Sequence, residues 1–185
     1  MKFFLSPILH LALIVALVVY CFGRTLTGYF LADDPAQVAY VNVTVTSEPI
    51  RIWQNMTGNY MQIPGMNVWR PTLFVSMVCD YLFWGVNACG FYFTNLAYFT
   101  GCAGLFYVLI RQLTDPWGRM RSASTALFST FWFVASPLRC ESVSWVVGRV
   151  DIISCFFYLV GFNLLVFSRK KASKLVTSGI VAAFW

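Results

Sequence analysis

The most regular feature of the chain is a series of long apolar segments separated by short polar stretches. Segments 3–22, 90–110, 123–137 and 151–168 are mostly apolar, and 175–185 begins another. About 20 apolar residues in a helix span the roughly 30 Å hydrocarbon core of a bilayer. Because unsatisfied backbone groups are costly in lipid, helices are the expected spanning form. The pattern predicts an all-α polytopic transmembrane protein with four crossings and the start of a fifth, in a single region covering 1–185.

The stretch between the first two crossings, residues 24–88, is the largest polar interval. Its first part is rich in Asn, Gly, Pro and Thr, which is typical of irregular, solvated structure. The second part, from Thr72 to Trp84, is mostly apolar but carries Asp80, and it follows Pro71. Proline is well placed in the first turn of a helix. We therefore expect a large loop followed by an interfacial helix lying along the membrane.

Composition agrees with a membrane location. Apolar residues make up 59% of the chain and charged residues 11%, which is too little charge to cover the surface of a soluble domain. The sequence has no CxxC spacing and no cluster of histidines and cysteines, so it predicts no metal site. The single histidine, His10, falls in the first apolar segment and is expected to be packed or hydrogen-bonded.

The distribution of charge predicts how the chain is oriented. With the N-terminus in the cytoplasm, eight basic residues and one acid fall on the cytoplasmic side, and five basic residues and six acids fall on the other side. Cytoplasmic loops are normally enriched in Lys and Arg. The large loop is therefore expected on the outer or lumenal face. The positive net charge reflects this topology and does not indicate nucleic-acid binding.

Two adjacent acids, Asp33 and Asp34, follow the first crossing. A carboxylate at the membrane surface can accept a proton from an acceptor hydroxyl. A neighbouring like charge and low dielectric would raise one of the two pKa values, which favours a base that works near neutral pH. The alternative is structural, because Asp-Asp-Pro is also a good start for a helix.

Two further polar groups are expected on the outer face. Arg70 runs against the usual inside bias, so it should pair with a lipid phosphate or an acid such as Asp80, or extend to the headgroups. The second group lies in the turn Ser136 to Asp151. Its charged residues either compensate one another or form a phosphate-binding site, and composition does not choose between these. They are Arg139, Glu141, Arg149 and Asp151.

The loop also contains two glycosylation sequons, at Asn42 and Asn55. They are relevant only if the loop faces an endoplasmic reticulum lumen, and both can arise by chance.

Five pieces of the sequence, in order, resemble a known family. They are the Asp-Asp pair, Trp69-Arg-Pro-Thr-Leu, Asp80-Tyr-Leu-Phe-Trp-Gly-Val-Asn, Gly90-Phe-Tyr-Phe-Thr-Asn-Leu and the segment 136–151. This order is similar to the N-terminal part of GT-C glycosyltransferases, above all the transmembrane O-mannosyltransferases that carry tetratricopeptide repeats, and their prokaryotic relatives. Segment 136–151 resembles that group's His-Pro-x-His-x-Glu-Ser-Val-x-Trp-x-x-Gly-Arg-x-Asp signature.

The resemblance implies a polyprenyl-phosphate-linked sugar as donor and inversion at the sugar carbon. It makes Asp33 or Asp34 the candidate base and assigns Arg70, Glu141, Arg149 and Asp151 to a donor or acceptor pocket. Three departures bear on activity. Ser136 and Arg139 stand where the signature has histidines, Tyr92 stands where a histidine is expected before Thr-Asn, and the sequence stops inside an apolar segment. The chain is therefore expected to be a fragment or a truncated gene product, and to be inactive alone.

Two functions follow from these expectations. The first is a membrane glycosyltransferase, or its N-terminal part, that transfers a sugar such as mannose to an acceptor on the lumenal or periplasmic side. The alternative is a non-catalytic membrane subunit or assembly factor that keeps a truncated GT-C-like fold. The expected partners are membrane lipid, a lipid-linked donor, and a protein acceptor or other membrane proteins. The expected location is the bacterial inner membrane or the endoplasmic reticulum membrane.

Overall fold

The computed structural model describes residues 6–63, 65 and 67–171, and within these ranges the chain is helical and contains no β-strand. The chain divides into two compact units. Unit 1 comprises residues 1–21, 98–139 and 154–185, and unit 2 comprises residues 22–97 and 140–153. The main helices are α1 (Pro7–Phe22), α2 (Asp34–Thr46), α3 (Ile50–Thr57), α4 (Pro71–Trp84), α5 (Ala88–Leu113), α6 (Arg119–Ala135), α7 (Cys140–Ser144) and α8 (Arg149–Lys171).

Three of the described helical segments are long and apolar enough to cross a membrane: Pro7–Thr27, Ala88–Leu113 and Arg149–Arg169. This confirms an all-α integral membrane protein with several spans. The predicted crossing at 123–137 corresponds to α6, whose 17 residues give a length of about 25 Å, and its crossing stays a prediction. The fifth predicted segment, 175–185, lies outside the described residues.

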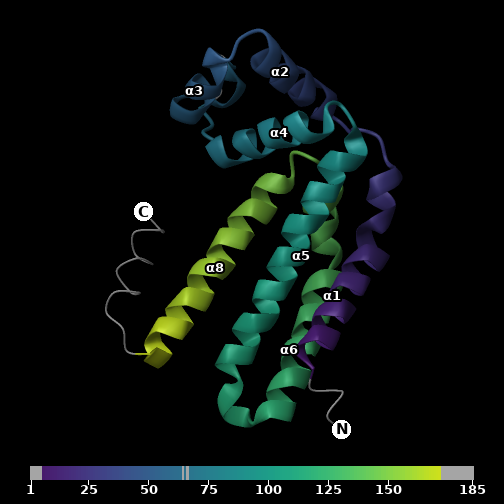
Figure 1. Cartoon of the computed structure of the whole chain (residues 1–185), viewed down its shortest axis with the longest axis vertical. Helices are drawn as coiled ribbons and strands as arrows, with labels where there is room; N and C mark the ends of the chain where they lie inside the picture. The colour runs from purple at the N-terminus through teal and green to yellow at the C-terminus, as the bar shows by residue number, and fades with distance from the viewer. Residues whose placement is uncertain (1–5, 64, 66, 172–185) are drawn as a thin grey trace. The chain divides into compact units, whose positions relative to one another are not determined.

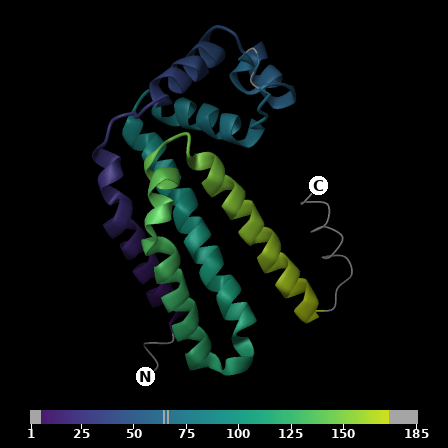
Figure 2. The same cartoon turned by 180° about the vertical axis from the view of Figure 1, so that it is seen from behind.

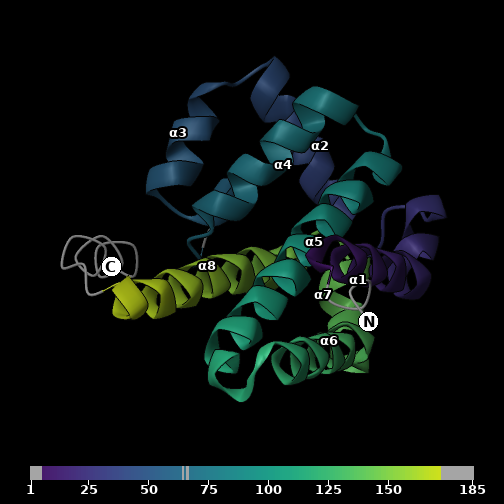
Figure 3. The ribbon, with the colours of Figure 1, turned by 60° about the horizontal axis from the view of Figure 1, so that its bottom comes forward.

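Unit 1 holds the larger part of each of the three candidate spans, and its helices run alternately up and down. Figure 1 shows α6 antiparallel to α5, with α8 running in the same direction as α5, and Figure 2 shows the same order from behind. A short turn that contains Gly118 joins α5 to α6 (Figure 3). If α5 and α8 both cross the membrane in one direction, then the chain must return between them, and α6 is the helix that is available to do so.

Several polar side chains inside unit 1 are hydrogen-bonded to one another, as low-dielectric surroundings favour. The ring of His10 lies 2.6 Å from the hydroxyl oxygen of Tyr107, which agrees with the expected hydrogen-bonded histidine. On another pair of helices, the amide of Gln112 donates to Asn163 at 3.0 Å. These bonds connect α1 with α5 and α5 with α8.

Unit 2 corrects the expectation of an irregular loop after the first crossing. The loop region instead contains helices α2 and α3, which pack against α4 (Figure 1). The reason is a set of apolar side chains that are spaced along helices and can be buried together, even though the segment is rich in turn-forming residues. The core includes Val38, Val41, Tyr60, Leu73, Phe74, Met77, Phe91, Tyr92, Val146 and Val147.

Helix α4 is the expected apolar helix between Thr72 and Trp84, and it begins one residue earlier at Pro71. Proline can start a helix because the first N–H groups have no intrahelical acceptor. The helix ends at Gly85, whose φ of 62° is a left-handed conformation that glycine adopts readily. One face of α4 is buried in unit 2 and carries Asp80, which is 4% exposed.

The segment between α7 and α8 is a tight connection that depends on Gly148. A Cβ atom at Gly148 would lie 3.0 Å from the carbonyl oxygen of Glu141 and 3.1 Å from the Cα of Ser142. Only glycine fits such a close approach of two backbones without displacement. The connection brings the backbone of Val146 and Val147 into the core of unit 2.

Candidate functional site

The two adjacent acids at the start of α2 have different environments. Asp33 is exposed, and its Oδ2 accepts a hydrogen bond of 2.6 Å from the Nε2 of Gln37. Asp34 is 0% exposed and is the first residue of α2. Their exposure differs because α2 begins at Asp34, and side chains of adjacent residues at the start of a helix point in different directions. Asp33 occupies the N-cap position but makes no capping bond with its side chain.

Backbone N–H groups surround the buried Asp34 carboxylate. The N–H of Leu31 donates to Oδ2 at 3.1 Å, the N–H of Val147 donates to Oδ1 at 3.3 Å, and the N–H of Val146 donates to Oδ2 at 3.5 Å. Burial raises the pKa of Asp34, the three backbone donors act in the opposite direction, and the charge of Asp33 contributes a smaller increase. Asp34 therefore attaches the start of α2 to the segment before α8.

A polar chain extends from Asp33 into the core of unit 2. Gln37 donates to Asp33 and accepts a short hydrogen bond from the hydroxyl of Tyr60, which also lies 3.6 Å from the Sδ of Met77. Burial raises the pKa of Tyr60, while the positive charge of Arg70 acts to lower it. Asp33, Gln37, Tyr60 and Arg70 therefore form one electrostatic neighbourhood that α2, α4 and the intervening segment build together.

Sequence reasoning missed Gln37 and Tyr60. Gln37 could have been found, because it lies four residues after Asp33, on the same face of the helix that Asp-Asp-Pro starts. Nothing in the sequence pointed to Tyr60. Its position depends on the way that the segment between α3 and α4 folds back onto α2.

The buried guanidinium of Arg149 forms the second polar cluster of unit 2. Its Nη1 lies 2.5 Å from the Oδ2 of Asp80 and donates to the Oγ of Ser76 at 2.8 Å. Its Nη2 donates to the carbonyl oxygen of Phe91 at 2.7 Å, and its Nε donates to the Oδ1 of Asn95 at 2.5 Å. Arg149 is 0% exposed, so it supports the site from the interior and does not face an open pocket.

Asp80 completes this cluster and corrects one expected pairing. Its Oδ1 accepts a hydrogen bond of 2.7 Å from the Oγ1 of Thr94, and its Oδ2 faces Arg149. Burial raises the pKa of Asp80, and the charge of Arg149 opposes this increase. Asp80 is therefore the partner of Arg149 and is not available to pair with Arg70, which is half-buried at the start of α4.

Asn95 connects the Arg149 cluster to the acids. Its Nδ2 donates to the carbonyl oxygens of Val143 and Trp145, at 3.2 and 3.0 Å. The same segment supplies the N–H donors of Val146 and Val147 to Asp34. Arg149 therefore orients Asn95, Asn95 holds segment 143–145, and the residues that follow position Asp34.

The remaining predicted site residues lie at the surface of unit 2. Glu141 and Asp151 are exposed, and the Oδ2 of Asp151 accepts a hydrogen bond of 3.3 Å from Ser142. Tyr92, at the position of an expected histidine, is buried and donates to the carbonyl oxygen of Tyr29 at 2.9 Å.

Within the described ranges, no group of three or more His, Cys, Asp or Glu side chains could hold a metal ion.

The two sequons differ in exposure. Asn55 is 0% exposed, and its Nδ2 donates to the hydroxyl of Tyr40 at 3.0 Å and to the carbonyl oxygen of Arg51 at 2.8 Å. A glycan on this nitrogen would therefore have to be attached before α3 packs. Asn42 is half-buried, and its Oδ1 accepts a hydrogen bond of 2.7 Å from Tyr81. Glycosylation of either residue stays a prediction.

Sequence comparison finds relatives among the protein O-mannosyl-transferases. The chain is 23% identical over 163 residues to Protein O-mannosyl-transferase TMTC1 of Homo sapiens, a match that covers 85% of the chain and 18% of that protein. It is 26% identical over 169 residues to TMTC4 of Homo sapiens, covering 85% of the chain and 23% of that protein. It is 22% identical over 175 residues to TMTC3 of Mus musculus, covering 93% of the chain and 18% of that protein.

The chain thus spans about a fifth of the length of these relatives. No protein-family model matches it. No solved structure matches it either. Along most of its length, the chain is therefore similar to one part of the protein O-mannosyl-transferases of the TMTC group.

Proposed function

We propose that the chain is a membrane glycosyltransferase of the GT-C type, or a part of one. It transfers a sugar from a polyprenyl-phosphate donor to a hydroxyl group of a protein acceptor, and mannose is the sugar to test first. The N-terminus is cytoplasmic, and transfer takes place on the lumenal or periplasmic face. The similarity to protein O-mannosyl-transferases supports the reaction class, and the charge distribution supports the orientation.

The observation that carries this proposal is the contrast between Asp33 and Asp34. Asp33 is exposed and is oriented by Gln37, whereas Asp34 is buried and held by backbone donors. A general base must reach the proton that it removes, and a hydrogen bond from a neighbour fixes its direction. Asp33 is thus suited to act as the base, and Asp34 to position it.

In the reaction, Asp33 accepts the proton of the acceptor hydroxyl as the oxygen attacks the anomeric carbon of the sugar. The new carbon–oxygen bond forms while the bond between the sugar and the donor phosphate breaks. The phosphate leaves with the bonding electrons, so the anomeric carbon is inverted in a single displacement. One base and a good leaving group are sufficient, and no covalent enzyme intermediate is required.

Arg70, Glu141 and Asp151 are the remaining candidates for the donor or acceptor pocket. All three keep part or all of their side chains accessible in unit 2. Arg70 can donate paired hydrogen bonds to a phosphate, and the two acids can accept bonds from sugar or acceptor hydroxyls. Arg149 serves the same site indirectly, through Asn95 and the segment that holds Asp34.

A transfer assay tests the assignment of the base. Membranes that contain the protein are supplied with a radiolabelled polyprenyl-phosphate mannose, and incorporation into protein is measured for Asp33→Asn and Asp34→Asn. We expect Asp33→Asn to lower kcat by about 10²–10⁴-fold, because it removes the general base. Glu48→Gln is the matched control, because it removes an acid elsewhere in unit 2 that pairs with Arg51 at the surface.

Two outcomes would overturn this proposal. If both aspartate variants transfer sugar at the normal rate, neither carboxylate is the base. If no variant and no wild-type protein transfers sugar, while the chain purifies in fixed stoichiometry with other membrane proteins, the non-catalytic subunit is the correct function.

A further inference from the structure

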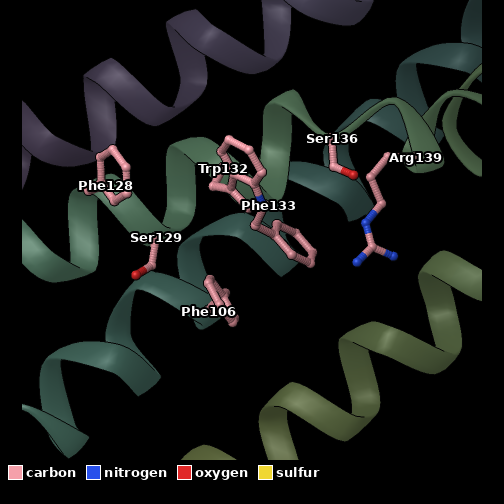
Figure 4. A pocket seen from close by; sticks show the side chains of 7 residues that line it. All are labelled: Phe106, Phe128, Ser129, Trp132, Phe133, Ser136 and Arg139. Carbon is pink, nitrogen blue, oxygen red and sulfur yellow. The ribbon is translucent and has the colours of Figure 1, made fainter.

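Unit 1 contains a groove whose lining includes none of the residues assigned above to the proposed reaction. It has a volume of about 570 Å³ and lies between α5, α6 and the turn after α6. Figure 4 shows its lining, with Ser136 and Arg139 at one end and Phe128 and Ser129 at the other. The volume lies within the range of about 300–1,000 Å³ that is usual for small-molecule sites. The lining residues are Phe106, Phe128, Ser129, Trp132, Phe133, Ser136 and Arg139.

Stacked aromatic rings make one wall of the groove rigid. The ring of Phe133 stacks on Phe106 at a centroid distance of 4.9 Å and on Phe99 at 5.8 Å, with interplanar angles of 20° and 21°. Offset stacking of this kind restricts ring motion and adds to the energy of burial. The wall is thus formed before any ligand binds.

Arg139 lies against this wall and has donor capacity left. Its guanidinium carbon is 4.7 Å from the centre of the Phe133 ring, which is a favourable cation–π distance. Its Nε is buried and finds no hydrogen-bond partner among the described residues. A buried donor without an acceptor is costly, so an acceptor from a ligand would be bound with a net gain.

Nearby acids of unit 1 do not supply that acceptor. Among the described residues of this unit, Asp115 is the only carboxylate. It precedes α6, whereas Arg139 follows it, so the helix separates them by about 25 Å. Glu141, two residues further along the chain, belongs to unit 2, and among the described residues Arg139 forms no ion pair. Its guanidinium is therefore available to the anionic group of a ligand.

The surroundings restrict the kind of anion. The groove is built on helices of an integral membrane protein, and its lining is mostly aromatic with one cation at one end. This arrangement is complementary to an amphiphile that has one phosphate group and an apolar chain.

We propose that this groove binds the phosphate and the adjoining isoprene units of a polyprenyl phosphate, with Arg139 donating to the phosphate and Phe133 and Trp132 contacting the chain. The assignment deepens the proposed function and rests on it for the identity of the lipid. Ser136, at the same end as Arg139, adds a hydroxyl donor within the lining.

The test is a binding measurement that needs no sugar transfer. The detergent-purified protein is titrated with polyprenyl phosphate, and bound lipid is quantified by native mass spectrometry. Arg139→Gln is expected to weaken binding of polyprenyl phosphate by about tenfold or more, because a charge-assisted bond is lost. It should leave binding of the uncharged polyprenol unchanged. Arg121→Gln is the matched control, because it removes an exposed charge from the other end of α6.

A second variant tests the wall without disturbing the core. Trp132 is 76% exposed, and Trp132→Ala should weaken binding of polyprenyl phosphate and polyprenol alike. Trp117→Ala removes a tryptophan of similar exposure that does not line the groove, and it should have no effect. A photoreactive polyprenyl phosphate should label residues of the groove lining in the wild-type protein.

Several results would overturn the assignment. Equal binding by Arg139→Gln and Arg121→Gln would exclude Arg139 as the phosphate ligand. Equal binding of phosphatidylglycerol and polyprenyl phosphate would exclude an isoprenoid-specific groove, and competition by inorganic phosphate alone would exclude a role for the chain. If the wild-type protein binds the lipid through Arg139 but transfers no sugar, the proposed function fails and the groove stands. If the wild-type protein transfers sugar and Arg139→Gln binds polyprenyl phosphate normally, the groove assignment fails and the proposed function stands.

Discussion

The buried ion pair of Arg149 and Asp80 allows a quantitative prediction for Arg149→Met. Methionine fills much of the space of arginine but removes the ion pair and the hydrogen bonds to Ser76, Phe91 and Asn95. Asp80 is left buried, with the hydroxyl of Thr94 as its remaining hydrogen-bond donor. Breaking one side of a buried pair typically costs about 3–5 kcal/mol.

The pH dependence of this loss follows from the pKa of Asp80. Burial already raises that pKa, and Arg149 is the main group that opposes the increase. Without Arg149 the folded-state pKa rises further above its unfolded value. The folded state then binds a proton more readily than the unfolded state, so the variant gains stability as the pH falls through the raised pKa and loses it as the pH rises.

The assay is thermal unfolding of the purified protein, followed by circular dichroism between pH 5 and pH 8. A loss of 3–5 kcal/mol corresponds to a decrease in Tm of roughly 6–20 °C for a chain of this length. The matched control is Arg51→Gln, which breaks the ion pair between Arg51 and Glu48, whose side chains are 32% and 45% exposed. Exposed pairs contribute about 0–1 kcal/mol, so the control should change Tm by a few degrees at most.

The comparison can refute the reasoning in two ways. If Arg149→Met lowers Tm no more than Arg51→Gln does, the buried cluster does not hold unit 2 together. If the loss is large but independent of pH, the cost comes from packing and not from the unpaired Asp80 carboxylate.

Two further changes probe the site and its backbone. Tyr60→Phe removes the hydroxyl that donates to Gln37, and it should cost about 0.5–1.5 kcal/mol in thermal unfolding and lower sugar transfer less than Asp33→Asn does. A loss of transfer as large as that of Asp33→Asn, with unchanged stability, would mean that Tyr60 itself contacts substrate. Gly148→Ala should destabilise the protein by about 1–3 kcal/mol, because the new Cβ would press on the backbone of residues 141 and 142. Gly104→Ala is the matched control, because a Cβ atom there would lie 4.0 Å from the Cδ1 of Leu11 and alanine favours a helix. A larger loss of stability for Gly104→Ala than for Gly148→Ala would contradict the explanation.

The sequence was sufficient for features that depend on neighbouring residues. Apolar segments of about 20 residues located α1, α5 and α8, and Pro71 located the start of α4 to within one residue. Helix formation and membrane insertion are governed by local composition and periodicity, so a single sequence contains this information. The resemblance to O-mannosyltransferases likewise followed from short motifs in a fixed order.

The tertiary structure decided which polar groups meet. Arg149 pairs with Asp80 on a helix far earlier in the chain, although Glu141 and Asp151 are much closer in sequence. Tyr60 reaches Gln37 only because the segment predicted to be irregular folds into helices with a common core. The tertiary structure also distinguishes the two adjacent acids. Helix α2 directs the carboxylate of Asp33 to the surface and that of Asp34 towards the backbone of Val146 and Val147. Burial and pairing depend on contacts between distant segments, and no local pattern specifies which charge loses its water and which partner replaces it.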